Sequence, residues 1–226
     1  MESSSANIRP VALVTGGTSG IGAAICRRLA QDGCAIIVNY YRNAQDAADL
    51  VDEIGGHSRA LAVQADVSVD ADVQHMVDAA IESFGRIDIL VNNASFSSAE
   101  LWNADPLKIP LDQWQRSLDV DLTGAYLCAR HVIPHMARGG RGKILNFSSS
   151  GSLQGDIDTF AYNAAKTGVV ALAKGLAKAF APAIQVYAIA PGSIDSGWIE
   201  RWNLTGQEIA GLKATSTRER SPVVRT

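Results

Sequence analysis

Residues 15–22 read TGGTSGIG and lie between an apolar run, residues 11–14, and a segment of helical period that extends from about residue 19 to residue 31. A glycine-rich turn that joins a strand to a helix is the context in which proteins bind dinucleotides. Glycine lets the backbone turn sharply and approach a pyrophosphate, and the helix behind it presents unpaired N–H groups and the positive end of its dipole. The spacing G-x-x-x-G-x-G is not the commoner G-x-G-x-x-G, and alone the turn is also compatible with a tight connection that binds nothing.

The alternation of short apolar runs and helical segments continues along the chain. Strands are expected at residues 11–14, 35–38, 60–63, 87–91, 143–147 and 184–189, and helices at 19–31, 43–54, 69–84, 111–138 and 160–181. Strands that are apolar throughout are buried on both faces, and right-handed crossovers distribute the helices over both sides of the sheet. We therefore predict an α/β fold with a single Rossmann-type, doubly wound parallel sheet of strand order 3-2-1-4-5-6.

Composition and charge narrow the class of protein. The 226 residues are 47% hydrophobic and 19% charged and contain no repeat or linker, so one dinucleotide-binding domain over residues 1–226 is expected. A formal net charge of −3 without a Lys/Arg-rich run argues against nucleic-acid binding. No apolar run is long enough to span a membrane, and the three cysteines, without a C-x-x-C pair or a secretory signal, predict a cytoplasmic location. The expected partners are small molecules and further copies of the chain.

The end of the second expected strand bears on the choice of dinucleotide. An acidic residue there would accept hydrogen bonds from the ribose hydroxyls of NAD, whereas a basic residue would pair with the 2′-phosphate of NADP. The run is Asn39-Tyr-Tyr-Arg-Asn43, without a carboxylate. Arg42 suits a bidentate phosphate contact and Tyr41 could flank the adenine, which favours NADP(H) and leaves NAD(H) possible. The alternative is that Arg42 is a solvated residue at a helix start.

Tyr162 and Lys166 lie four residues apart near the start of an expected helix. They therefore share one face, and their side chains can converge on one ligand. A phenol with a pKa of about 10 is a poor catalyst at neutral pH, but a fixed ammonium favours the phenolate and lowers that pKa. The alternative is a surface pair at ordinary helical spacing.

Four features together resemble the short-chain dehydrogenase/reductase family, and especially its 3-oxoacyl-carrier-protein reductases. They are the turn at 15–22, the run Asn92-Asn-Ala-Ser95 after the fourth strand, Ser149 thirteen residues before Tyr162, and Pro191-Gly192 after the sixth strand. The resemblance implies an NADP(H)-dependent enzyme that interconverts a ketone or aldehyde and an alcohol, as a homodimer or homotetramer. It implies that Tyr162 is the general acid/base, that Lys166 also holds the nicotinamide ribose, and that Ser149 donates a hydrogen bond to the substrate oxygen.

The expected cofactor contacts combine the turn, the second strand and the resemblance. They are Gly16, Thr18, Ser19, Gly20, Ile21, Gly22, Tyr41, Arg42, Asn43, Asp66, Val67, Asn93, Ala94, Ser95, Tyr162, Lys166, Pro191, Gly192, Ile194 and Ser196.

The chain departs from the family's pattern at several positions. Asp121 stands where many members have an asparagine that holds a water for a proton relay from the lysine, so we count Asp121 among the catalytic residues. Ser95 replaces the usual glycine, and Ser196 stands where a threonine is common. Members normally continue past the segment that resembles residues 221–226 into a further helix and strand, which this sequence is expected to lack.

Substrate is expected beyond the carboxyl ends of the strands, in contact with Ser149, Phe96, Gln154 and Trp198. Trp198, Ile199 and Trp202 form an apolar stripe, so residues 193–226 are expected to form a lid over the substrate or to pack on the core or a neighbouring subunit. His131 and His135 have helical spacing, but no third ligand accompanies them and Pro134 is expected to interrupt the helix, so no metal site is expected. The alternative function is a non-catalytic NADP(H) sensor or scaffold.

Overall fold

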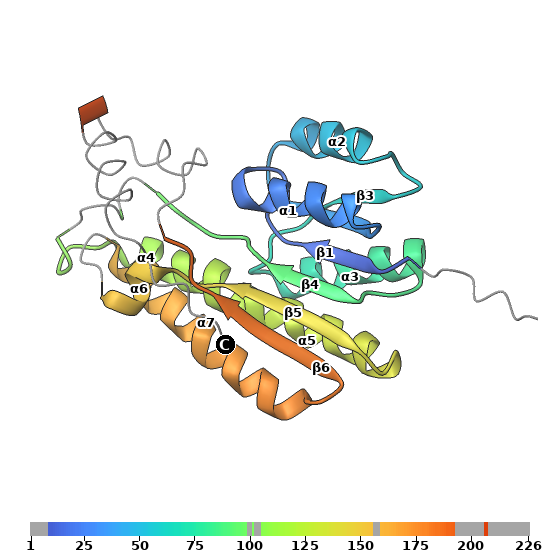
Figure 1. Cartoon of the computed structure of the whole chain (residues 1–226). Helices are drawn as coiled ribbons and strands as arrows, with labels where there is room; N and C mark the ends of the chain where they lie inside the picture. The colour runs from blue at the N-terminus through green and yellow to red at the C-terminus, as the bar shows by residue number, and fades with distance from the viewer. Residues whose placement is uncertain (1–8, 99–100, 102–104, 156–158, 193–205, 208–226) are drawn as a thin grey trace, which may run out of the picture.

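A computed structural model describes residues 9–98, 101, 105–155, 159–192 and 206–207 of the chain. Six parallel strands form one sheet in the order β3-β2-β1-β4-β5-β6, as the sequence predicts (Figure 1). The strands are β1 (Val11–Val14), β2 (Ala35–Tyr40), β3 (Ala60–Gln64), β4 (Ile89–Asn92), β5 (Gly142–Phe147) and β6 (Ile184–Ile189).

The central strands are apolar because both of their faces are covered. All four residues of β1 are buried, and so are the first five residues of β2. Leu13, Ile36 and Ile37 are completely buried, and burial of such a side chain contributes about 1.5–3 kcal/mol.

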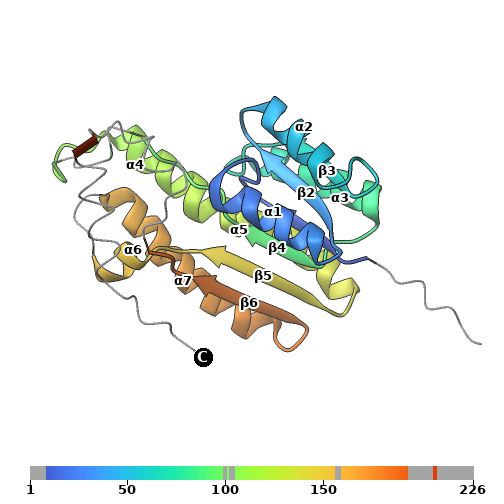
Figure 2. The ribbon, with the colours of Figure 1, turned by 45° about the horizontal axis from the view of Figure 1, so that its top comes forward.

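Helices cover the two faces of the sheet in turn (Figures 1 and 2). α1 (Gly20–Gln31) and α2 (Ala44–Glu53) supply Cys26, Leu50 and neighbouring apolar side chains to the core on one face. α3 (Asp70–Phe84), α5 (Gly124–Arg138) and α7 (Phe160–Phe180) cover the other face. This is the doubly wound arrangement, in which ligands bind where the strand order reverses, between β1 and β4.

β6 is the outermost strand on its side of the sheet and pairs only with β5 in the part of the chain that the structure describes. No later strand extends the sheet in those described residues. Tyr187 and Ile189 on β6 are exposed. The lid expected at residues 193–226 lies outside the described residues apart from 206–207, and the assignment of the whole chain to one domain stays a prediction.

The helix expected at residues 111–138 has a more complex form. α4 (Leu111–Leu118) continues into a π-helical turn, η2 (Asp119–Thr123), and then into α5. A π turn inserts one extra residue into the helix and changes the direction of the side chains around it. Glycines let neighbouring elements pack closely around this turn. A Cβ atom added at Gly168 of α7 would lie only 2.9 Å from the Leu122 side chain, and one added at Gly124 would lie 2.8 Å from the Val67 side chain.

Two further differences concern local sequence rules. Pro134 was expected to interrupt its helix, and this prediction is wrong because α5 continues through Pro134 to Arg138. The short helix α6 (Ser150–Gln154) was not expected, since five residues carry too little periodicity to be recognised. None of the described helices combines the length and the apolar character that a membrane crossing requires.

Candidate active site

Hydrogen bonds join the residues that follow β1 to the residues that follow β4, at the point where the strand order reverses. The Thr15 hydroxyl accepts hydrogen bonds from the backbone N–H groups of Asn93 and Ala94, both at 3.0 Å. The Asn93 amide donates to the carbonyl oxygens of Thr15 and Gly16, also at 3.0 Å. Asn93 therefore connects the glycine-rich turn to the end of β4.

The glycine-rich turn leaves no space for side chains at two of its positions. Gly16 has a positive φ of 60°, and a Cβ there would lie 3.0 Å from Cα of Ala94. A Cβ at Gly22 would lie 2.2 Å from the carbonyl oxygen of Gly16. These contacts pack the first turn of α1 tightly against the turn, and that helical turn carries no acidic side chain. A helix start of this kind suits the pyrophosphate of a dinucleotide, so the residues present fit the cofactor that the family uses.

At the end of β2, Tyr41 is accompanied by two arginines. The guanidinium of Arg42 lies 5.2 Å from the centre of the Tyr41 ring, and that of Arg116, from α4, lies 5.7 Å from it. Tyr41 and Arg42 are exposed, while Asn43 adopts a left-handed backbone conformation just before α2. Two positive charges therefore lie near the position where the sequence predicts the adenine and the 2′-phosphate.

Asp66, the expected adenine contact after β3, has protein partners of its own. Its carboxylate accepts hydrogen bonds from the Ser68 hydroxyl at 2.6 Å and from Arg116 at 2.7 Å. Burial raises the pKa of Asp66, but these donors outweigh burial and leave the pKa below its usual value. Val67 beside it is buried. Asp66 is therefore an anion that fixes Arg116 in place.

Tyr162, Lys166 and Ser149 lie together beyond the carboxyl end of β5. The Lys166 ammonium lies 5.5 Å from the centre of the Tyr162 ring, and Ser149 is hydrogen-bonded to Tyr162. The chain around them is anchored because the Ser148 hydroxyl donates to the carbonyl oxygen of Lys166 at 2.8 Å. Three residues chosen from spacing and family pattern thus occupy one place in the structure.

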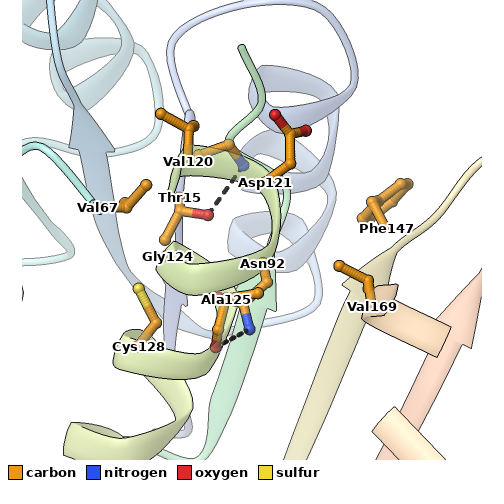
Figure 3. Close-up of a pocket in the computed structure, with 11 residues that line it drawn as sticks. Thr15, Val67, Asn92, Val120, Asp121, Gly124, Ala125, Cys128, Phe147 and Val169 are labelled. Carbon is orange, nitrogen blue, oxygen red and sulfur yellow. Dashed lines mark hydrogen bonds between the residues drawn. The ribbon is translucent and has the colours of Figure 1, made fainter. Parts of the chain in front are cut away.

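Asp121 joins this group directly. Its carboxylate forms an ion pair of 3.0 Å with the Lys166 ammonium, and both side chains are almost completely buried. The same carboxylate accepts hydrogen bonds from the Ser95 hydroxyl and, at 2.9 Å, from the backbone N–H of Phe96. Asp121 lies on η2, whose extra residue sets the direction of its side chain. Figure 3 shows the carboxylate at one end of the small pocket described below.

The pKa of Tyr162 differs from the sequence-based expectation. Burial raises it, and the Asp121 carboxylate also raises it, whereas the Lys166 ammonium and the hydrogen bond with Ser149 lower it. The balance is a pKa above the usual value for tyrosine. The expected lowering by Lys166 is present but is too small, because the ring is desolvated and the ammonium is paired with an anion.

A small pocket lies beneath Asp121 and is lined by residues of β4, η2 and α5, among others (Figure 3). The Asn92 amide donates to the carbonyl oxygen of Ala125 at 3.2 Å and to the Asn146 side chain at 2.9 Å. The other walls are mainly apolar. The lining residues are Thr15, Val67, Asn92, Ala94, Val120, Asp121, Gly124, Ala125, Cys128, Phe147 and Val169.

The remaining residues that the sequence predicts to contact the cofactor or the substrate lie in different environments. The Pro191 carbonyl oxygen accepts a hydrogen bond from Ser150 at 2.9 Å, and Gly192 is exposed. Phe96 packs partly buried against the core, whereas Gln154 is exposed on α6. Ile194, Ser196 and Trp198 lie outside the described residues.

The two histidines with helical spacing have separate partners. His131 lies 2.8 Å from Asp70, and His135 lies 2.8 Å from Arg138. No group of three metal-ligating side chains occurs in the described ranges.

Arg116 is the residue of this region that sequence reasoning missed. It lies fifty positions after Asp66 and on a different element, so no spacing rule relates the two. The amphipathic pattern of residues 111–118 indicates a helix, but it does not indicate which polar residue of that helix contacts Asp66.

Comparison with known proteins connects this geometry to a family. The family described as short chain dehydrogenase matches residues 10–205. A 3-oxoacyl-[acyl-carrier-protein] reductase of Synechocystis sp. is 37% identical over 85% of this chain and 77% of its own length. Glucose 1-dehydrogenase 2 of Bacillus subtilis is 36% identical over 81% of this chain and 71% of its own length. The crystal structure of a 3-ketoacyl-(acyl-carrier-protein) reductase from Brucella melitensis, complexed with NADH, is 35% identical and superposes with a TM-score of 0.79, covering 85% of this chain and 79% of that one.

Proposed function

This chain belongs to the short chain dehydrogenase family of NAD(P)-dependent oxidoreductases, and we propose that it uses NADP(H) to interconvert a small carbonyl compound and its alcohol, with Tyr162 as the acid/base. The observation that carries the proposal is the grouping of Tyr162, Lys166 and Ser149 beyond β5. Each of these side chains has a distinct task in a carbonyl reduction.

The nicotinamide, when bound, supplies or accepts the hydride. In the direction of reduction, Tyr162 donates its phenolic proton to the carbonyl oxygen of the substrate as charge develops there. Ser149 donates a hydrogen bond to the same oxygen and thereby stabilises that charge. Lys166, which is buried and lies 5.5 Å from the Tyr162 ring centre, would donate to the ribose of a bound cofactor, and its positive charge favours loss of the proton from Tyr162. Burial raises the pKa of Tyr162, which favours the protonated phenol that the role of acid requires.

The preference for NADP(H) is supported by the charges at the end of β2. Arg42 and Arg116 both lie within 6 Å of the Tyr41 ring centre, and the strand ends without a carboxylate. Arg116 is held in an ion pair with Asp66, whereas Arg42 is exposed. We therefore assign Arg42 to the 2′-phosphate.

A 3-oxoacyl thioester or a related small carbonyl compound is the proposed substrate class. Its support is that two similar proteins, one curated and one of known structure, are named as reductases of such substrates. We assign Asn93 and the glycine-rich turn to the cofactor, and Phe96 and Gln154 to the substrate side of the site. A cytoplasmic location is supported by three unpaired, buried cysteines, and a homo-oligomer is proposed without a defined interface.

The test is oxidation of NADPH and of NADH, followed by absorbance, with acetoacetyl thioester, diketone, sugar, steroid and pterin substrates. We expect turnover with NADPH and an acetoacetyl thioester. Tight NADPH binding without turnover on any substrate would instead favour the sensor. Turnover with NADH alone would refute the assignment of Arg42.

A further inference from the structure

Two residues that depart from the family's pattern contact each other in this structure. The Ser95 hydroxyl donates a hydrogen bond to Oδ1 of Asp121. The two residues are twenty-six positions apart in the sequence, one after β4 and the other on η2. Nothing in their separate positions along the chain suggests that they act together.

The Asp121 carboxylate is held from three directions. Its Oδ1 also receives the Lys166 ammonium at 3.0 Å, and its Oδ2 accepts from the backbone N–H of Phe96 at 2.9 Å. The buried carboxylate therefore has three donors, one of them a cation, which satisfy its hydrogen-bonding capacity. α7 approaches η2 closely at Gly168, where an added Cβ would lie 2.9 Å from Leu122, and both side chains of the ion pair are almost completely buried.

The pair changes the charge that Tyr162 experiences. Tyr162 is faced by Lys166 from its own helix, by Asp121 from η2 and by Ser149 from the junction of β5 and α6. The charges of Lys166 and Asp121 are opposite, so the carboxylate offsets part of the effect of the ammonium on the phenol, although the ammonium has the larger effect.

We propose that Ser95 is a positioning residue that acts through Asp121: its hydroxyl holds the carboxylate against Lys166, so that Tyr162 faces an ion pair instead of a lone ammonium. Burial raises the pKa of Tyr162 most, the Lys166 ammonium lowers it, and the Asp121 carboxylate offsets part of that lowering. If Tyr162 is the acid/base, a point that rests on the proposed function, the site favours the reduction of a carbonyl over the oxidation of an alcohol at neutral pH.

The experiment is a pH titration of the full chain labelled with ¹³C at Cζ of its five tyrosines. The Tyr162 resonance is identified by its loss in Tyr162→Phe, and its midpoint is measured by NMR without any need for turnover. We expect Asp121→Asn to lower the midpoint by about 1 pH unit or more, because the ammonium then acts on the phenol alone. Asp119→Asn is the matched control: it removes the same charge from the same helical turn, where Asp119 accepts from Gln115, and it leaves the midpoint unchanged.

Ser95 is tested by its coupling to Asp121. Ser95→Ala lowers the Tyr162 midpoint by less than Asp121→Asn does, Ser95→Thr retains the wild-type midpoint, and Ser95→Ala adds nothing in an Asp121→Asn background. The proposal is overturned if Asp121→Asn leaves the midpoint unchanged, or if Ser95→Ala has the same effect in both backgrounds. If Asp121→Asn does not fold, the Ser95 variants test the proposal by themselves. An unchanged Tyr162 midpoint in Ser95→Ala would then refute the positioning role of Ser95.

Kinetics then separate this inference from the proposed function. We expect the rising limb of the pH profile for alcohol oxidation to move to lower pH in Asp121→Asn by the same amount as the NMR midpoint. A midpoint that moves while the kinetic limb stays in place would leave the ion pair as described and would refute Tyr162 as the acid/base.

Discussion

At the scale of single residues, the chemistry of the site depends on how buried polar groups are partnered. Lys166 and Asp121 are both buried, and their 3.0 Å ion pair satisfies each of them. Tyr162 has Ser149 as a hydrogen-bonding partner and Lys166 as a neighbour, so its hydroxyl is both oriented and electrostatically controlled. Arg42 differs from all of these because it is exposed, and its proposed role is to contact a ligand.

Replacement of Tyr162 by phenylalanine removes only the hydroxyl that transfers the proton. We expect turnover to fall by on the order of 10²–10⁴-fold while the affinity for NADPH changes little. Steady-state kinetics and a fluorescence titration with NADPH measure the two quantities. Tyr126→Phe, at an exposed position on α5, is the control and retains wild-type turnover. Wild-type turnover in Tyr162→Phe would remove the catalytic assignment.

Replacement of Arg42 by alanine tests the choice of cofactor. Loss of a charge-assisted hydrogen bond to phosphate costs about 1.5–3 kcal/mol, so the affinity for NADPH is expected to fall by roughly 10- to 100-fold. The affinity for NADH, which has no 2′-phosphate, is expected to stay within about twofold, as calorimetry can measure. Arg28→Ala, an exposed arginine paired with Asp32 on α1, is the control for overall charge. Equal losses for both cofactors would show that Arg42 is structural.

At the scale of elements, the junction of β1 and α1 is defined by contacts that exclude side chains. The helix begins so close to the preceding turn that a Cβ at Gly22 would overlap the carbonyl oxygen of Gly16. The Asn93 amide occupies the other side of the same space, 2.6 Å from that Cβ position. The turn, the helix start and β4 therefore behave as one unit, and a change in any of them alters the proposed pyrophosphate site.

A pair of glycine substitutions separates this packing requirement from helix propensity. Gly22→Ala is expected to displace the backbone and to weaken NADPH binding, measured by titration, together with a lower Tm. Gly175→Ala, within α7 and without a neighbouring atom near its Cβ position, is the matched control. Alanine is favoured over glycine in a helix by about 1 kcal/mol, so Gly175→Ala is expected to raise the Tm and keep NADPH affinity. Normal NADPH affinity in Gly22→Ala would contradict the close approach.

At the scale of the whole molecule, the two halves of the doubly wound sheet are joined by contacts far apart in sequence. Arg116, on α4 in the second half, reaches back to Asp66 and Ser68 after β3 in the first half. The Asn93 amide, after β4, donates to the carbonyl oxygens of Thr15 and Gly16 after β1. The Asp66–Arg116 ion pair is partly buried, so solvent screens it less than a surface pair. It connects the proposed adenine end of the site to the helix that continues into η2.

Arg116→Met is expected to lower the free energy of unfolding by about 1 kcal/mol at neutral pH, because a partly buried carboxylate loses its cationic partner. Burial raises the pKa of Asp66, but its hydrogen bonds and Arg116 lower it further, so the pKa in the folded state lies below the unfolded value of about 3.9. The stabilisation that the ion pair contributes is therefore fully present above the unfolded pKa and is lost as pH falls through the folded pKa. The difference between the variant and wild type should therefore shrink on acidification below that range.

Urea denaturation over a series of pH values measures this difference. Arg130→Met, which disrupts an exposed pair with Asp70, is the control and is expected to change stability by less than about 0.5 kcal/mol. A difference for Arg116→Met that is independent of pH would show that Asp66 is not its energetic partner.

The sequence by itself determined the strand order, the glycine-rich turn and the identity of Tyr162, Lys166 and Ser149 as candidates. These features are local or periodic: apolar runs fix which segments are buried strands, and a four-residue spacing fixes which side chains share a helical face. Only the tertiary structure decided that Asp121 pairs with Lys166 and Ser95, and that the pKa of Tyr162 is raised. Those properties depend on burial and on distances between segments far apart in the chain, and neither quantity is encoded in the spacing of residues along it.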